Sequence, residues 1–377
     1  MGYVAVKGGT EAIEHASRLL TYERIKGDSK PLEVAQIREQ LRLLVDRVMG
    51  EGSLYAPDLA ALAIKQSAGD TFEAAFMLRA YRATVPRITC SIPQETSGMR
   101  IIRRISAAFK DIPGGQILGP TSDYTLRLID FELSDDTKIK RKAFLNGLFK
   151  DIPGLSSVSA SFPKVIELLR KENLLVENSV TTGSIPATGP NGTFDITRKS
   201  LTFPANSSAT MQAMTRAETG GLLLLAYSNM RGYGDTHPTI GELRVGYLPV
   251  RIKHPLTGNP YTIGDVAVTE AEVIAKFTAQ SDSPKFTLGY GLCFGHNEVK
   301  AISMAVLDRA MQIREPKMPS EDQEFVLSHI DGIESMGFCT HYKLPHYVTF
   351  QSDLDRLRKT QDINNTRRDK VKVESEI

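Results

Sequence analysis

The chain has 377 residues, 41% of them apolar and 24% charged, which predicts a folded protein of one large domain or two closely packed ones. Its 46 basic and 44 acidic residues leave a formal net charge of +2, and this balance argues against a nucleic-acid-binding surface. Neither a signal peptide nor an apolar run of the roughly 20 residues that a membrane helix needs is recognisable, so we expect a cytoplasmic protein without a membrane partner.

The N-terminal region is predicted to be mainly helical. Apolar residues over 34–48 recur at spacings of three and four, which places them on one face of a helix. Asp70 followed by Glu73 predicts the N-cap of a second helix, which ends before Pro86. A third helix is expected over 101–109, before a proline-glycine turn.

The middle of the chain is rich in serine, threonine, asparagine, glycine and proline. This composition extends over 134–208 and is interrupted by a helical pattern at 165–175, so we place the connection between the two halves here. Short apolar runs separated by turns follow, and they predict strands at 221–227, 242–250 and 265–269.

Helices are predicted again near the C-terminus. Asn297 is expected to cap a helix whose inward face carries Val299, Ile302, Val306, Ala310 and Ile313. Another helix is predicted over 326–333. After Thr360 the chain has too little apolar surface to offset the entropy lost on ordering, and we expect a frayed tail.

These elements together predict an α+β fold in which a helical N-terminal half packs with a strand-containing C-terminal half. The predicted regions are a helical 1–133, a loop-rich 134–208, a mixed 209–358 and a disordered tail at 359–377, with 1–358 forming one family-level domain. Three widely separated cysteines predict neither a disulfide framework nor a cluster of metal ligands.

Two histidines, His341 and His346, stand five residues apart with Pro345 between them. The proline argues against a continuous helix, and two imidazoles in a bent, extended segment could hold one ion such as zinc. Two ligands alone would leave positions for a group from elsewhere in the fold, from a partner chain or from substrate. The spacing by itself also fits two hydrogen-bonded loop histidines.

A second polar cluster lies over 231–247. Its glycines would let the backbone approach a ligand, and Arg231 and Arg244 offer planar donor groups suited to phosphate or phosphonate oxygens. Three side chains are of types that carry out acid–base chemistry: Asp235, His237 and Glu242. A glycine-rich hairpin with solvated salt bridges would account for the same residues.

Glycines and basic residues suggest two further phosphate contacts. Gly289 and Gly291 precede the helix expected at Asn297, whose N-terminus could bind a phosphate, and we take them as candidate substrate-binding residues; a structural turn is the alternative. Four basic residues could reach a triphosphate, although such charge is usually that of a solvated helix face. They are Arg100, Arg103, Arg104 and Lys110.

A set of short motifs, in order along the chain, resembles the PhnI family, the I subunit of the carbon–phosphorus lyase core complex. They are YVAVKGG at 3–9, VDRVM at 45–49, LRAYR at 78–82, KDIPGGQ at 110–116, RGYG at 231–234, HP at 237–238, GYGL at 289–292, EFVL at 324–327 and KLPHYV at 343–348. The resemblance extends to about residue 358, leaving out 134–208.

The resemblance implies a complex with the G, H and J subunits, two copies of each, to which ABC-type K and L subunits attach. It implies that the I subunit, with G, H and L, converts methylphosphonate and ATP into alpha-D-ribose 1-methylphosphonate 5-triphosphate and adenine. Alone, such a subunit would act as a nucleosidase on ATP or GTP. The family also places a zinc ion at the boundary with J, held by two histidines that match His341 and His346.

Displacing a purine from C1′ requires a carboxylate near the cationic carbon and an acid for the departing base. We assign Glu242 or Asp235 to the first role, His237 to the second, and Arg231 with Arg244 to the oxyanions. The alternative is a non-catalytic scaffold pinned through the zinc site. A stand-alone zinc hydrolase would ordinarily need three ligands from its own chain.

Overall fold

The computed structural model describes residues 9–151, 162–176, 193–231, 238–275, 283–313 and 315–375. The chain forms two compact units, one of residues 32–332 and one of residues 1–31 together with 333–377. Among the described residues, no helix has both the length and the apolar character needed to cross a membrane. The domain ranges expected from the sequence stay predictions.

The larger unit begins with four helices around an apolar core of their own. They are α2 (Val34–Gln40), α3 (Arg42–Gly52), α4 (Pro57–Gln66) and α5 (Thr71–Thr84). The predicted face is confirmed as core by the buried Ile37, Val45 and Val48, although it spans two helices because the chain breaks at Leu41. Asp70 caps α5 by accepting a 3.1 Å hydrogen bond from the Glu73 amide, as predicted.

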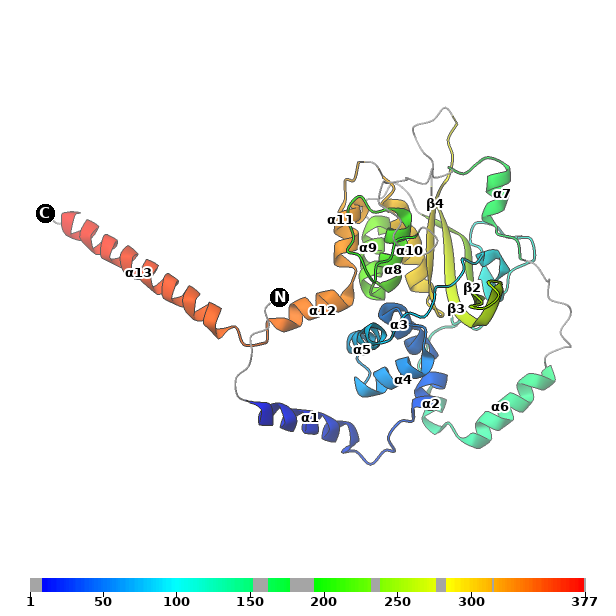
Figure 1. The fold of residues 1–377 in the computed structure, drawn as a ribbon, viewed down its shortest axis with the longest axis horizontal. Coiled ribbons are helices and arrows are strands. Elements are labelled where there is room, and N and C mark those ends of the chain that lie inside the picture. The colour runs from blue at the N-terminus through cyan, green and yellow to red at the C-terminus, as the bar shows by residue number, and fades with distance from the viewer. Residues whose placement is uncertain are drawn as a thin grey trace. The chain divides into compact units, whose positions relative to one another are not determined.

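A four-stranded antiparallel sheet in the order β1-β2-β3-β4 forms the centre of this unit (Figure 1). The strands are β1 (Arg100–Ile105), β2 (Thr239–Lys253), β3 (Pro260–Ala275) and β4 (Thr287–Phe294). The strands predicted at 242–250 and 265–269 are confirmed by β2 and β3. The α+β fold class is therefore confirmed as well.

Helices cover one face of the sheet: α8 (Ser207–Arg216), α9 (Thr219–Arg231) and α10 (Glu298–Ala310), with α11 (Gln323–His329) beside them. They enclose the largest apolar core with inward-facing residues of β2, β3 and β4 (Figure 1). Asn297 caps α10 as predicted, because its side chain accepts a 3.1 Å hydrogen bond from the Lys300 amide. Val306 and Ala310 are buried, but the inward orientation predicted for Val299 is wrong, since this residue is exposed.

The other face of the sheet is covered in part by α7 (Ile166–Lys171), which confirms the helical pattern at 165–175. Ile166 and Leu169 of α7 pack against Ile274 of β3. A further helix, α6 (Lys138–Asp151), lies in the region predicted to be loop-rich. The described part of the larger unit also contains the short 3-10 helices η1 (Thr96–Gly98), η2 (Phe131–Asp135) and η4 (Pro319–Glu321).

Two predictions of element type are wrong. The helix expected over 101–109 begins as strand β1, because the residues between its isoleucines, Arg103 and Arg104, are buried by ion pairs that a sequence pattern does not show. The strand expected over 221–227 lies within helix α9. A short apolar run fits a buried strand or a helix equally well, so periodicity alone could not separate the two.

The smaller unit holds α1 (Thr10–Ile25), most of α12 (Gly332–His341) and α13 (Tyr347–Ser375). Helix α13 continues past Thr360 to Ser375, in the stretch where we expected a frayed tail, and the order of that tail in solution stays a prediction. Its polar sequence contains four arginines and three lysines, which favour helix, and ion pairs at a spacing of three, such as Asp353 with Arg356, add support.

Candidate functional site

Five charged side chains gather on the sheet face opposite α10, and we call them the sheet-face cluster. They are Arg104 of β1, Glu242 and Arg244 of β2, and Glu270 and Glu272 of β3. Successive residues of a strand point to opposite faces, so the apolar neighbours Leu243 and Ala271 enter the core beneath α10 while the charges collect on the other side. All five are buried, none exposing more than 6% of its surface.

Glu242 is held by three groups. Its Oε1 accepts a 2.5 Å hydrogen bond from Arg104 Nε and lies 2.8 Å from Arg244 Nε, while its Oε2 accepts a 2.9 Å bond from the Val165 amide. Both oxygens are therefore occupied. In this conformation the carboxylate positions two arginines, and direct contact with a substrate would require one of these bonds to break.

The two arginines are held differently. Arg104 Nη1 donates to backbone oxygens of Pro113 and Gly115, and its Nη2 donates to the Pro163 oxygen, so the whole guanidinium is used. Arg244 Nη2 donates to the Phe162 oxygen at 2.7 Å, whereas its Nη1 is buried without a hydrogen-bond partner among the described residues. Arg244 thus retains a donor for an anionic oxygen.

Glu270 and Glu272 share one cation. Lys164 Nζ lies 2.5 Å from Glu270 Oε1 and 2.9 Å from Glu272 Oε1. The hydroxyls of Thr96 and Tyr290 also donate to Glu270 Oε1, at 2.6 and 2.8 Å. The Oε2 atoms of both carboxylates are buried and have no hydrogen-bond partner within the described parts of the chain.

Burial raises the pKa of Glu272 in the sheet-face cluster and of Tyr290, which contacts the cluster. Desolvation raises the pKa of Glu272, the Lys164 ammonium opposes the rise, and the nearby Glu270 and Glu242 carboxylates add to it. Burial and the Glu270 carboxylate also raise the pKa of the Tyr290 hydroxyl, so Tyr290 remains a hydrogen-bond donor at neutral pH. A buried acid beside a second carboxylate is an arrangement suited to proton transfer.

The two glycines predicted to bind substrate face α10. A Cβ on Gly289 would lie 1.9 Å from the Ala305 oxygen, and one on Gly291 would lie 2.0 Å from the Ala301 oxygen. Both backbone oxygens belong to α10, on the side of the sheet away from the cluster. Close packing of helix on strand thus explains these glycines without a ligand, and their role in substrate binding has no support in this geometry.

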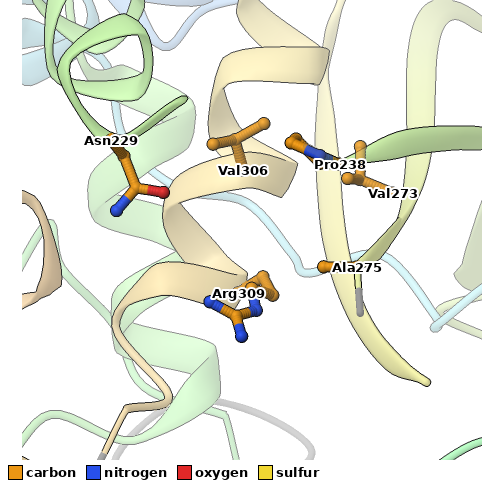
Figure 2. Close-up of a pocket in the computed structure, with 6 residues that line it drawn as sticks. All are labelled: Asn229, Pro238, Val273, Ala275, Val306 and Arg309. Carbon is orange, nitrogen blue, oxygen red and sulfur yellow. The ribbon is translucent and has the colours of Figure 1, made fainter. Parts of the chain in front are cut away.

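Arg231 ends α9 on the surface, where its Nη1 donates to the Tyr227 hydroxyl. Asp235 and His237, the other two predicted catalytic residues of this segment, lie outside the described residues. A small hollow lies on the α10 side of the sheet (Figure 2). Its described lining residues are Asn229, Pro238, Val273, Ala275, Val306 and Arg309, and no predicted site residue that the structure describes is among them.

His341 and His346 do come together in the smaller unit. Their ring centroids are 5.3 Å apart, with His341 at the end of α12 and His346 just before α13. The Nδ1 atom of each ring contacts a backbone oxygen, Phe338 for His341 and Leu344 for His346, which leaves the Nε2 atoms for a ligand. Among the described residues, no group of three or more histidine, cysteine, aspartate or glutamate side chains could hold a metal ion.

Sequence reasoning missed Lys164, Glu270 and Glu272, and it misread Arg103 and Arg104 as a basic helix face. Glu270 and Glu272 alternate with apolar residues in β3, a strand pattern that also fits a solvated sheet face. Lys164 stands in a segment without a motif. Only their burial together in the folded sheet distinguishes these residues, and the single sequence carries no signal for it.

The chain matches a protein family described as "Bacterial phosphonate metabolism protein (PhnI)" over residues 2–364. It is 56% identical over 370 residues to a putative C-P lyase subunit protein HtxH of Stutzerimonas stutzeri, covering 96% of both chains. It is 44% identical to the alpha-D-ribose 1-methylphosphonate 5-triphosphate synthase subunit PhnI of Escherichia coli strain K12, over 96% of this chain and 99% of that one. The protein of the same name from Rhizobium meliloti strain 1021 is also 44% identical, over 95% and 94%.

Proposed function

Because the chain belongs to the PhnI family of bacterial phosphonate metabolism proteins, we propose that it is a subunit of a carbon–phosphorus lyase complex that transfers ribose 5-triphosphate from a purine nucleoside triphosphate to methylphosphonate. The product would be alpha-D-ribose 1-methylphosphonate 5-triphosphate, with the purine base released. The observation that carries this proposal is the 44% identity to two synthase subunits over nearly their whole lengths.

The transfer breaks the bond between C1′ and the purine nitrogen and forms a bond from C1′ to a phosphonate oxygen. Its transition state has oxocarbenium character, so the site must supply negative charge near C1′ and cationic donors for the phosphonate. The sheet-face cluster supports this chemistry, because buried carboxylates lie beside Arg244, whose Nη1 has no partner among the described residues.

Roles for the remaining predicted residues belong to the same proposal. Arg231, exposed at the end of α9, is suited to a triphosphate or phosphonate oxygen because nothing buries its guanidinium. Asp235 and His237 follow Arg231 in the sequence. In this proposal Asp235 is the carboxylate near C1′, and His237 is the acid for the departing base. Glu242 acts in this scheme by positioning Arg104 and Arg244.

A zinc site at His341 and His346 also fits the geometry. Each ring is oriented by a backbone oxygen on Nδ1, as is common for metal-binding histidines, and imidazole nitrogen is a ligand that zinc prefers. A bound zinc ion would supply a Lewis acid for phosphate or phosphonate oxygens. Since two ligands leave the coordination incomplete, we propose that a J-type partner subunit or the substrate provides the others.

The partners in this proposal are the G, H and J subunits in two copies each, with ABC-type K and L subunits attached. The scaffold alternative, in which the chain only pins the complex together, is favoured by the surface of the smaller unit. Phe338, Tyr342, Tyr347 and Phe350 all expose more than half of their surface near the histidine pair, as residues of a protein interface would.

Measuring release of the purine base distinguishes a catalytic subunit from a scaffold. We expect the purified chain to release adenine from ATP and guanine from GTP, measured by liquid chromatography, without partner subunits. Addition of the G, H and L subunits with methylphosphonate should convert hydrolysis into ribosyl transfer. A folded chain that releases no base under either condition would be a scaffold.

A further inference from the structure

We propose that Glu270 and Glu272 of β3 are the catalytic carboxylates of base displacement, and that Lys164 is a tethered cation that occupies their site until substrate binds. This inference rests on the proposed function and assigns residues to its chemical step. It replaces the assignment made from the sequence, in which Glu242 or Asp235 supports the sugar and His237 protonates the departing base.

The first argument is the position of the Lys164 ammonium. Glu270 and Glu272 stand two apart on one strand, so both carboxylates reach the same face, and Lys164 Nζ lies 2.5 Å from one and 2.9 Å from the other. The pair therefore stabilises a positive charge in a site shielded from water. An oxocarbenium-like C1′ carries the same sign of charge, so the carboxylates that hold the ammonium are suited to that carbon.

The second argument is the set of buried polar atoms that the described residues leave without hydrogen bonds. Three donors converge on Glu270 Oε1 and none reaches Oε2, while Glu272 Oε2 and Arg244 Nη1 also have no partner in the described ranges. Arg244 and Glu270 are directly paired across β2 and β3. Buried polar groups are nearly always paired, so the arrangement indicates a ligand that both donates and accepts.

A ribose with a phosphonate beside it meets this description. Sugar hydroxyls donate to carboxylate oxygens, and an anionic phosphonate oxygen accepts from a guanidinium. By contrast, Glu242 remains bound to Arg104 and Arg244 through Oε1 even when the Val165 amide leaves its Oε2. The geometry therefore divides the three glutamates into one that positions the arginines and two that face the substrate.

The two carboxylates take different roles. Three donors, one of them the Lys164 ammonium, fix the orientation of Glu270, whereas Lys164 is the one hydrogen-bond donor to Glu272 among the described residues. When substrate displaces the ammonium, burial and the carboxylates of Glu270 and Glu242 favour the protonated form of Glu272. Glu272 is then the acid, and Glu270 is the carboxylate that supports C1′.

The chemical step balances with these roles. As the bond from C1′ to the purine nitrogen breaks, its electron pair stays with the base, which takes the proton of Glu272. A phosphonate oxygen gives an electron pair to C1′, and the proton that the phosphonate monoanion loses returns to Glu272. The site is ready for the next turnover once the base and the ribosyl phosphonate leave.

Substrate can reach the sheet-face cluster only if the segment over 162–165 moves. Phe162 and Pro163 accept hydrogen bonds from Arg244 and Arg104, and Val165 donates to Glu242, so this segment holds Lys164 over the cluster by several bonds. A phosphonate oxygen could replace the backbone oxygens as acceptor for the arginines, and a sugar hydroxyl could replace the Val165 amide as donor to Glu242.

Two substrates with different leaving groups test the assignment. In the complex with partner subunits and methylphosphonate, ATP needs protonation of its base, whereas 7-methyl-GTP already carries a positive charge on its purine. We expect Glu272→Gln to lower base release from ATP by at least ~10²-fold and to leave release from 7-methyl-GTP within a few-fold. Glu270→Gln should lower release from both substrates, because both pass through the same cationic carbon.

Glu51→Gln is the matched control. Glu51 is a buried glutamate of α3 that accepts hydrogen bonds from Thr219, away from the sheet-face cluster, so its replacement should leave both rates nearly unchanged. Thermal unfolding and assembly with the partner subunits establish that each variant is folded. Equal losses with both substrates in Glu272→Gln would refute the role of Glu272 as the acid. Near-normal rates in both Glu270→Gln and Glu272→Gln would refute the assignment of these two residues as catalytic carboxylates.

If the variants fail to fold, the pH dependence of base release by the unaltered complex still tests the proposal. Base release from ATP should decrease as pH rises through the pKa of Glu272, and release from 7-methyl-GTP should lack this decrease. Identical pH profiles for the two substrates would contradict the proposal. An unaltered complex that releases no base from ATP would instead remove the proposed function on which it rests.

Discussion

Gly291 offers a direct test of whether the GYGL motif serves packing or substrate binding. We predict that Gly291→Ala destabilises the fold, since its Cβ would lie 2.0 Å from the Ala301 oxygen, about an ångström inside any normal contact. That oxygen belongs to the backbone of α10 and cannot rotate away. The helix must shift along a face where Ala301, Met304 and Ala305 are fully buried.

Overpacking of a core typically costs 1–3 kcal/mol and occasionally more. Because the obstacle is a helix backbone, we expect a loss near the upper limit, about 3 kcal/mol, and a fall of roughly 4–5 °C in the unfolding midpoint. Urea and thermal unfolding of the purified chain without nucleotide provide the measurement. Gly264→Ala is the control, since a Cβ there has no atom within 4 Å and should change the stability by no more than about 0.5 kcal/mol.

One outcome would contradict the packing argument for Gly291. If Gly291→Ala unfolds at the temperature of the unaltered chain and instead raises the KM for ATP, the packing argument is wrong and the glycine contacts substrate. A loss of stability with an unchanged KM per folded molecule would confirm that the motif serves the contact between β4 and α10.

Two further perturbations address the charged groups. Lys164→Met should lower the free energy of unfolding at neutral pH by about 3 kcal/mol, because it leaves two buried carboxylates without their cation. The deficit should shrink as pH falls, since the raised pKa of Glu272 means that the folded protein takes up a proton there readily; urea unfolding across pH checks this, and a deficit that grows in acid would contradict it. His341→Ala or His346→Ala should abolish zinc in the purified complex by metal analysis, while Cys339→Ser retains it; full zinc content in both histidine variants would exclude the site.

Local signals in the sequence were enough for much of the fold. Asp70 and Asn297 were identified as caps because a short polar side chain before an apolar period is a local feature, and both accept the expected amide. The short apolar run at 242–250, bounded by turns, identified strand β2 from local sequence as well. By contrast, the apolar run in α9 and the isoleucines of β1 fit either element, so only tertiary packing decides them.

The site was less predictable than the fold. Residue type and spacing made the histidine pair and Arg244 candidates, but Lys164 and Glu270 are more than 100 residues apart and meet only when the sheet is covered. Glu242 was correctly placed in a polar cluster, yet the structure shows both of its oxygens bound. Long-range pairing of this kind depends on strand register, which one sequence does not specify.

The most direct test of the account is ³¹P NMR of the assembled complex with ATP and methylphosphonate, together with detection of free adenine. The account predicts a new phosphonate ester resonance, with the triphosphate resonances intact and one adenine released for each ester formed. Adenine release without the ester, or an unchanged spectrum from a folded and assembled complex, would contradict transfer of the ribosyl group to the phosphonate.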